Sequence, residues 1–191
     1  MTYDKYADEY DQRYQSETSR MENALIKDKL YEHGIDEMES VMDFGCGTGF
    51  LLDLISVKEN AYVGLDVSER MINLARKKHP GKCFIQKEAG ALNFWQVDSV
   101  VSLFSIPYIG VEGVRSAYRH LKPGGIFFCV YYEKPYKSPD SVYCGHFMRY
   151  IACVAPKVKR VIEECNRLFE RIDSVPIGEG YRLTVYWKRG A

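Results

Sequence analysis

The chain has 191 residues, of which 46% are hydrophobic and 27% charged, and its 26 basic and 26 acidic residues cancel. This composition is typical of one globular domain with a substantial core. The zero net charge argues against binding a nucleic-acid backbone by charge alone, and no apolar run approaches the roughly 18 residues of a membrane span. The acidic, tyrosine-rich beginning, MTYDKYADEYDQRYQ, has no features of a targeting peptide, so we expect a cytoplasmic protein.

Short apolar runs that are typical of buried strands alternate with helical patterns. The expected strands are 41–44, 61–66, 83–86, 97–104 and 126–132, and the expected helices are 49–56, 69–79 and 111–121. The stretch 133–156 is less regular. Pro156 suits the first turn of a further helix that ends near Asn166.

Two late strands, near 168–175 and 181–188, are joined by Gly178-Glu-Gly180 and are predicted to form a hairpin. The whole pattern predicts one α/β domain, 1–191, with a seven-stranded, mainly parallel sheet and a C-terminal antiparallel hairpin. The six cysteines include no CxxC pair and are predicted to be free thiols. Zinc-type ligand spacing is absent, so no metal is expected.

Three glycines alternate with other residues in VMDFGCGTGF, directly after the first strand and Asp43. Ligands of doubly wound sheets bind beyond the carboxyl ends of the strands, so this is the expected cofactor loop. The dinucleotide fingerprint is not met, because Gly49 comes one residue too early, and a phosphate cradle is missing. We interpret the glycines as places where a Cβ would occupy ligand volume, and a plain tight turn is the alternative.

Two further acids follow neighbouring strands. Asp66 ends the second strand, where an acid can accept hydrogen bonds from both ribose hydroxyls of a nucleoside. Glu88 follows the third strand, where a carboxylate can accept from an exocyclic amine such as that of adenine. The alternatives are helix capping for Asp66 and a solvated loop acid for Glu88.

Together, VMDFGCGTGF, YVGLDVSERMINLARKK, FIQKEAGAL, VDSVVSLFSIPYI and RHLKPGGIFF resemble the class I S-adenosylmethionine-dependent methyltransferases of the small-molecule type. The resemblance covers roughly residues 40–131 and implies a Rossmann-like three-layer sandwich. It implies S-adenosyl-L-methionine as methyl donor and S-adenosyl-L-homocysteine as product. The cofactor-binding residues that it implies are Tyr14, Asp43, Gly45, Cys46, Gly47, Gly49, Asp66, Val67, Met71, Glu88, Ala89 and Leu103.

The acceptor side is expected in two segments that flank this core. Tyrosines 3, 6, 10 and 14 share one helical face, and this segment resembles the N-terminal helix of small-molecule methyltransferases, which implies a helical lid over 1–30. Packing onto the domain is the alternative. Residues 133–156 are aromatic-rich and are expected to form an acceptor-side insertion, with His146 as a candidate base. The predicted catalytic residues are Tyr14, Tyr108 and His146.

Ser105-Ile106-Pro107-Tyr108 also matches the tetrad of enzymes that methylate nucleobase or amide nitrogens. Our main hypothesis is nevertheless a methyltransferase that acts on N or O of a small molecule, as a monomer or homodimer. The alternatives are a nucleic-acid N-methyltransferase that uses this tetrad, and a protein that binds S-adenosylmethionine without catalysis. Neither nucleic acid nor a membrane is expected as a partner.

Overall fold

The computed structural model describes residues 11, 16–58, 60–91, 96–133, 144–178 and 180–190, with the backbone alone for 144–155. The strands in this part of the chain are β1 Val41–Phe44, β2 Tyr62–Asp66, β3 Cys83–Gln86, β4 Val97–Leu103, β5 Leu121–Tyr132, β6 Glu170–Ile177 and β7 Tyr181–Trp187. The helices are α1 Glu17–Glu32, α2 Phe50–Leu54, α3 Glu69–Lys78, α4 Ile106–His120 and α5 Cys144–Leu168.

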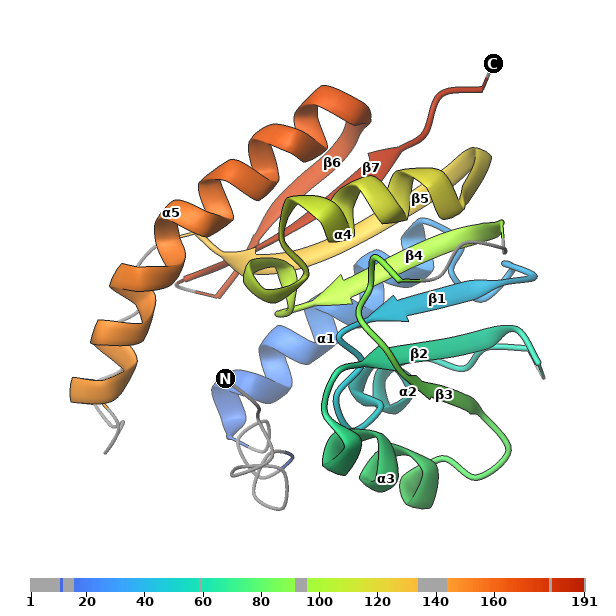
Figure 1. Ribbon diagram of the computed structural model, residues 1–191, viewed down its shortest axis with the longest axis horizontal. Coiled ribbons are helices and arrows are strands. Elements are labelled where there is room, and N and C mark those ends of the chain that lie inside the picture. Colours follow the sequence, from blue (N-terminus) through green and yellow to red (C-terminus); the bar gives the residue numbers. More distant parts are fainter. Residues whose placement is uncertain are drawn as a thin grey trace.

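All seven strands belong to one sheet with the order β3-β2-β1-β4-β5-β7-β6. The first five strands are parallel, and β7 runs antiparallel between β5 and β6. Figure 1 shows α4 and α5 on one face of the twisted sheet and α1, α2 and α3 toward the other. The predicted seven-stranded α/β sandwich with its closing hairpin is confirmed. The strand order reverses between β1 and β4, which is where such sheets bind ligands.

The core has two halves because successive residues of a strand point to opposite faces of the sheet. On β5, Phe127 packs with Val114 and the other apolar residues of α4 and α5, whereas Phe128 packs with Ile26 and Ile72 on the α1–α3 side. All five of these side chains are fully buried. The alternation explains why the central strands are apolar throughout.

Helix α3 forms for local reasons that the sequence shows. The hydroxyl of Ser68 accepts a hydrogen bond from the backbone N–H of Met71 at 3.1 Å, which caps the helix. Three basic residues in the last turn favour the negative end of the helix dipole. The apolar side chains Met71, Ile72 and Ala75 are buried, as predicted.

Helix α4 begins at Ile106, five residues earlier than predicted. Pro107 lies in its first turn, where a missing N–H costs no helical hydrogen bond. Gly110 has φ 61°, outside the helical region, and so kinks the helix just before the predicted start. The sequence therefore located the regular part of α4 and missed its first turn.

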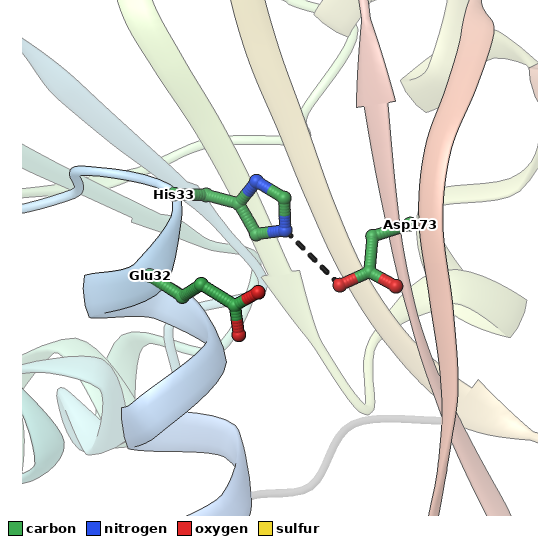
Figure 2. A group of neighbouring side chains, drawn as sticks. All are labelled: Glu32, His33 and Asp173. Carbon is green, nitrogen blue, oxygen red and sulfur yellow. Dashed lines mark hydrogen bonds and ion pairs between the residues drawn. The ribbon is translucent and has the colours of Figure 1, made fainter.

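Helix α1 is tied to the far edge of the sheet by charged side chains (Figure 2). Asp173 of β6 lies 3.0 Å from Lys29 Nζ and 3.1 Å from His33 Nε2. Glu32 lies 2.7 Å from the same ammonium. His33 and the two carboxylates are close enough to bind a cation, but Lys29 already supplies the positive charge between the acids. We interpret the group as an anchor for α1.

Ile26 and Leu30 of the same helix are fully buried in the core. Within the predicted lid, residues 17–30 therefore pack as part of the domain. Residues 1–10 and 12–15, which hold the four tyrosines, lie outside the described residues. The lid stays a prediction.

The sequence-based start of the last helix is wrong. Pro156 lies inside α5, which begins at Cys144, so residues 144–155 are helical and not irregular. An internal proline removes one hydrogen bond and crowds the preceding turn, which is why the sequence favoured a start at this residue. Pro156 is exposed, so its ring does not disturb the packing of the helix on the sheet.

We expect Pro156→Ala to raise the free energy of unfolding by about 1–3 kcal/mol, because alanine restores the missing helical hydrogen bond. Urea denaturation measures this directly. Pro107→Ala is the control, since the N–H at that first-turn position has no helical partner and no gain is expected. A Pro156→Ala protein no more stable than the wild type would show that the helix begins at Pro156 after all.

Candidate active site

The loop after β1 is held against the end of β2 by its own backbone. The N–H groups of Gly45 and Cys46 donate to the carbonyl of Leu65 at 2.8 and 3.0 Å. Gly45, Gly47 and Gly49 have φ of 71°, 55° and 87°, which residues with a Cβ rarely adopt. The backbone conformation alone therefore explains the three glycines.

The interpretation that a Cβ in this loop would occupy ligand volume is wrong at two of the glycines. A Cβ on Gly45 would lie 2.4 Å from the Cβ of Ser105, and one on Gly49 would lie 2.6 Å from the His79 ring. The space is already filled by the protein, because the end of β4 and the end of α3 pack directly on the loop. At these two positions, glycine leaves room for protein side chains that pack against the loop.

A pocket opens at the switch point between β1 and β4. It is lined by Asp43, Gly45, Cys46, Gly47, Phe50, Leu51, Leu103 and Phe104. Five of these were predicted as cofactor-binding residues, and the structure brings them together. Phe50, Leu51 and Phe104 were missed, although their places directly after the glycine loop and after β4 were a usable signal.

Asp43 is a buried acid at the base of this pocket, with 2% of its surface exposed. Burial raises the pKa of its carboxyl to about 7, a hydrogen bond from the Tyr62 hydroxyl opposes the rise, and the nearby charge of Asp66 adds to it. The Tyr62 hydroxyl donates to Asp43 Oδ2 at 2.9 Å. A buried carboxylate is costly without a cation, so the site favours a positively charged ligand group.

Asp66 is oriented by two backbone N–H groups. Gly47 donates to Oδ2 at 3.0 Å and Ser68 donates to Oδ1 at 2.9 Å. Capping of α3 does not explain Asp66, because the cap is the Ser68 hydroxyl. The half-buried carboxylate is instead held beside the glycine loop, where it can accept hydrogen bonds from a ligand.

The remaining predicted residues flank the ends of β2 and β3. Val67 is 54% exposed and Glu88 is exposed, whereas Met71 and Ala89 are buried. The side-chain amide of Gln86 donates to the Val67 carbonyl at 3.2 Å, which joins the two strand ends. An accessible acid, Glu88, and an exposed apolar side chain, Val67, thus lie at these strand ends, and their contact with an adenine ring stays a prediction.

Of the three predicted catalytic residues, the structure describes the side chain of Tyr108 alone. Tyr108 is 45% exposed in the first turn of α4. Tyr14 lies outside the described residues, and His146 lies in α5 where only the backbone is described. Their roles stay predictions.

Asp11 links the N-terminal segment to the glycine loop. Its Oδ1 accepts from the Thr48 hydroxyl at 2.5 Å and its Oδ2 lies 2.8 Å from Lys78 Nζ. Thr48 is a buried residue of the loop itself, between Gly47 and Gly49. Lys78 also pairs with Asp53 at 2.5 Å. Sequence reasoning considered only the tyrosines of this segment and missed the aspartate.

With this geometry in place, several known proteins can be compared with the chain, and most of them are methyltransferases. The methyltransferase domain family matches residues 41–125. An uncharacterized protein of Methanocaldococcus jannaschii is 31% identical over 129 residues, which are 65% of this chain and 48% of that protein. The Campylobacter jejuni ubiquinone/menaquinone biosynthesis C-methyltransferase UbiE is 27% identical over 68% of this chain and 59% of its own. The chain thus spans about half the length of these curated relatives.

A solved methyltransferase structure also has a similar fold. The N-methyltransferase NodS of Bradyrhizobium japonicum, in complex with S-adenosyl-L-homocysteine, has a TM-score of 0.65 at 14% identity, over 92% of this chain and 90% of NodS. Residues 41–125 thus match a methyltransferase domain, and the fold is shared with a methyltransferase of known structure. S-adenosyl-L-homocysteine, which is S-adenosylmethionine without its methyl group, is the molecule bound in that NodS structure. The residues of the pocket fit such a molecule, because Asp43 can neutralise a cationic group and Asp66 is an oriented acceptor beside the same loop.

No helix in the described ranges is long and apolar enough to cross a membrane.

The raised pKa of Asp43 predicts a pH-dependent stability. The unfolded carboxyl has a pKa near 3.9, so between about pH 4 and pH 7 the folded protein retains a proton that the unfolded chain loses. The free energy of unfolding of the ligand-free protein should therefore fall as pH rises through this window. Urea denaturation at pH 5 and pH 8 measures the difference, and Asp43→Asn should reduce it. An equal pH dependence in the two proteins would contradict the assignment.

The contacts of Asp11 predict that it supports cofactor binding. We expect Asp11→Ala to weaken the binding of S-adenosylhomocysteine about fivefold, because a hydrogen bond worth ~1 kcal/mol no longer holds the glycine loop. Isothermal titration calorimetry gives the dissociation constant. Asp53→Ala is the matched control: it removes the same charge from Lys78 but leaves the hydrogen bond between Asp11 and Thr48 in place. Equal effects of the two variants would rule out a specific role for Asp11.

Proposed function

We propose that the protein transfers a methyl group from S-adenosylmethionine to a nitrogen or oxygen of a small molecule. The observation that carries the proposal is the position of a buried acid, Asp43, and an oriented acid, Asp66, beside one glycine loop. The bound cofactor supplies an activated sulfonium methyl group. The protein then has to hold donor and acceptor in line, and orientation of this kind accounts for much of the rate of such reactions.

Each acid has a distinct task in this proposal. Asp43 would neutralise the amino group of the methionine end, which stabilises a carboxylate that is otherwise too buried to ionise readily. Asp66 would accept hydrogen bonds from the ribose hydroxyls while Gly47 and Ser68 keep its side chain in place. Tyr14, Tyr108 and His146 are proposed to act on the acceptor side.

Ser105 argues for a small-molecule acceptor over a nucleobase. Its hydroxyl donates to the Phe44 carbonyl at 2.5 Å and lies 2.6 Å from the Ser102 hydroxyl. A serine that is buried and bonded in this way does not face a target amine. Pro107, which completed the match to the tetrad, has a local explanation in the first turn of α4.

The two named relatives bear on the acceptor atom in different ways. NodS is an N-methyltransferase, which supports nitrogen, whereas the Campylobacter jejuni relative is a C-methyltransferase. A carbon acceptor is therefore an outcome that product identification has to test. The glycine-loop pocket is equally compatible with binding without transfer, so turnover is the decisive measurement.

The test is methyl transfer from radiolabelled S-adenosylmethionine into an extract of the source organism, separated into small-molecule, protein and nucleic-acid fractions. We expect label in the small-molecule fraction with the wild-type protein. Asp66→Asn should reduce it at least about tenfold, since an amide group is a poorer acceptor for two hydroxyls. Label in RNA or DNA would contradict the proposed acceptor class. No label in any fraction, with the cofactor bound, would indicate a binding protein.

A further inference from the structure

Four aromatic side chains form a row at the carboxyl edge of the sheet. The ring centroids are 6.2 Å apart for Phe50 and Phe104, 5.0 Å for Phe104 and Tyr181, and 4.4 Å for Tyr181 and Tyr132. Phe50 and Phe104 line the cofactor pocket, while Tyr132 and Tyr181 face each other at the end of the β5–β7 pairing. We call these four residues the aromatic wall.

The aromatic wall differs from the aromatic core in its exposure. The core rings Phe44, Tyr62, Phe127, Phe128 and Tyr186 are fully buried. Every ring of the wall is only partly buried. A run of partly exposed rings beside a ligand pocket is typical of a binding surface, because apolar and aromatic side chains line most small-molecule sites.

The backbone conformation of Phe104 indicates that its ring is held in place at a cost in conformational energy. Phe104 has φ 59°, a left-handed conformation that is unusual for a bulky residue and concentrates at functional sites. Its N–H donates to the Val130 carbonyl at 2.8 Å, which fixes this conformation at the end of β4. The ring is thereby directed between Phe50 and Tyr181, where it continues the wall from the pocket outward.

The polar groups at the outer end of the wall are phenols. The Tyr181 hydroxyl donates to the Tyr132 hydroxyl at 3.0 Å. The nearest charges in sequence, Arg182 and Glu133, lie 2.8 Å apart and compensate each other. Among the described residues, the wall therefore consists of partly buried rings and two hydroxyl groups, and no side chain of the wall itself is charged. This chemistry suits a neutral planar molecule better than a phosphorylated or strongly charged one.

We propose that the aromatic wall binds the methyl acceptor and that this acceptor is a small aromatic compound with its accepting hydroxyl or amine on or next to the ring. The inference rests on the proposed methyl transfer and names the class of its substrate. A ring that packs edge-to-face or offset against Phe104 and Tyr181 places its substituent toward the pocket, where the methyl group is delivered.

The proposed step balances without a further reagent. A lone pair on the acceptor oxygen or nitrogen forms the bond to the methyl carbon while the carbon–sulfur bond breaks. The electron pair of that bond stays on sulfur, giving the neutral thioether, and the proton of the hydroxyl or amine passes to water. The rings hold the acceptor in line with the methyl group and take no part in the bonds that form and break.

The experiment is chemical identification of the labelled product from the extract, by mass spectrometry and ultraviolet absorption. An aromatic product supports the inference. A saturated, aliphatic product overturns it and leaves the proposed transfer intact. Failure to label any small molecule overturns both the aromatic acceptor and the proposed transfer. This result is readily distinguished from a labelled aliphatic product.

Variants test whether the wall itself is responsible. We expect Tyr132→Leu and Tyr181→Leu to raise KM for the isolated acceptor about tenfold, because each loses a ring contact. S-adenosylhomocysteine should bind these variants within about twofold of the wild type, because neither tyrosine lines the cofactor pocket. Tyr132→Phe keeps the ring and should recover most of the loss.

Tyr118→Leu is the matched control. Tyr118 is another half-buried tyrosine, but it packs on Phe169 on the opposite side of the sheet, with a centroid distance of 5.2 Å. Its replacement should leave KM unchanged. Equal KM values for the Tyr132, Tyr181 and Tyr118 variants would overturn the assignment of the wall.

Discussion

The contact between Ser105 and the end of β1 is the constraint on which the site depends. The Ser105 hydroxyl donates to the Phe44 carbonyl, and its Cβ fills the space that a side chain on Gly45 would need. This residue adds a side-chain bond between the end of β4 and β1, two strands whose backbones already pair where the strand order reverses. Its small side chain packs against the glycine loop at Gly45, where a larger residue would collide with the loop. The pocket is lined by the same glycine loop and by the ends of β1 and β4.

The electrostatics of the site follow from this geometry. Packing behind the loop leaves Asp43 buried and deprived of water, while Asp66 stays half-buried and bonded to backbone N–H groups. Two acids beside the same loop thus differ in burial and in their hydrogen-bond partners. Such a pair can meet a cationic group at one end of a ligand and hydroxyl groups at the other, which matches the two ends of S-adenosylmethionine.

The sequence predicted the parallel core well because its signals are local. Buried strands of four or five apolar residues, the Ser68 cap and the glycine loop each appear within a few positions, and all lie where they were expected. Asp43 and Asp66 could be located in the same way, since the first lies in β1 and the second ends β2. Free thiols were predicted correctly for the four cysteines whose side chains are described.

What the sequence missed depends on contacts between distant segments. The interior position of Pro156 could not be inferred, because a proline pattern favours a helix start unless packing elsewhere stabilises the helix. The support of Gly45 by Ser105, 60 positions away, and the bond between Asp11 and Thr48, 37 positions apart, have no sequence pattern. The aromatic wall likewise joins residues from α2, β5, β7 and the turn after β4, so its rings are far apart along the chain.

The position of Ser105 also limits how this protein can change during evolution. It lies directly after β4, beside the proposed acceptor side, and its hydroxyl and Cβ already contact the end of β1 and the glycine loop. A larger residue there would push against Gly45 before it touched any acceptor. New acceptor preferences are therefore more accessible through neighbouring side chains such as Phe104 and Tyr108, whose changes leave the support of the loop untouched.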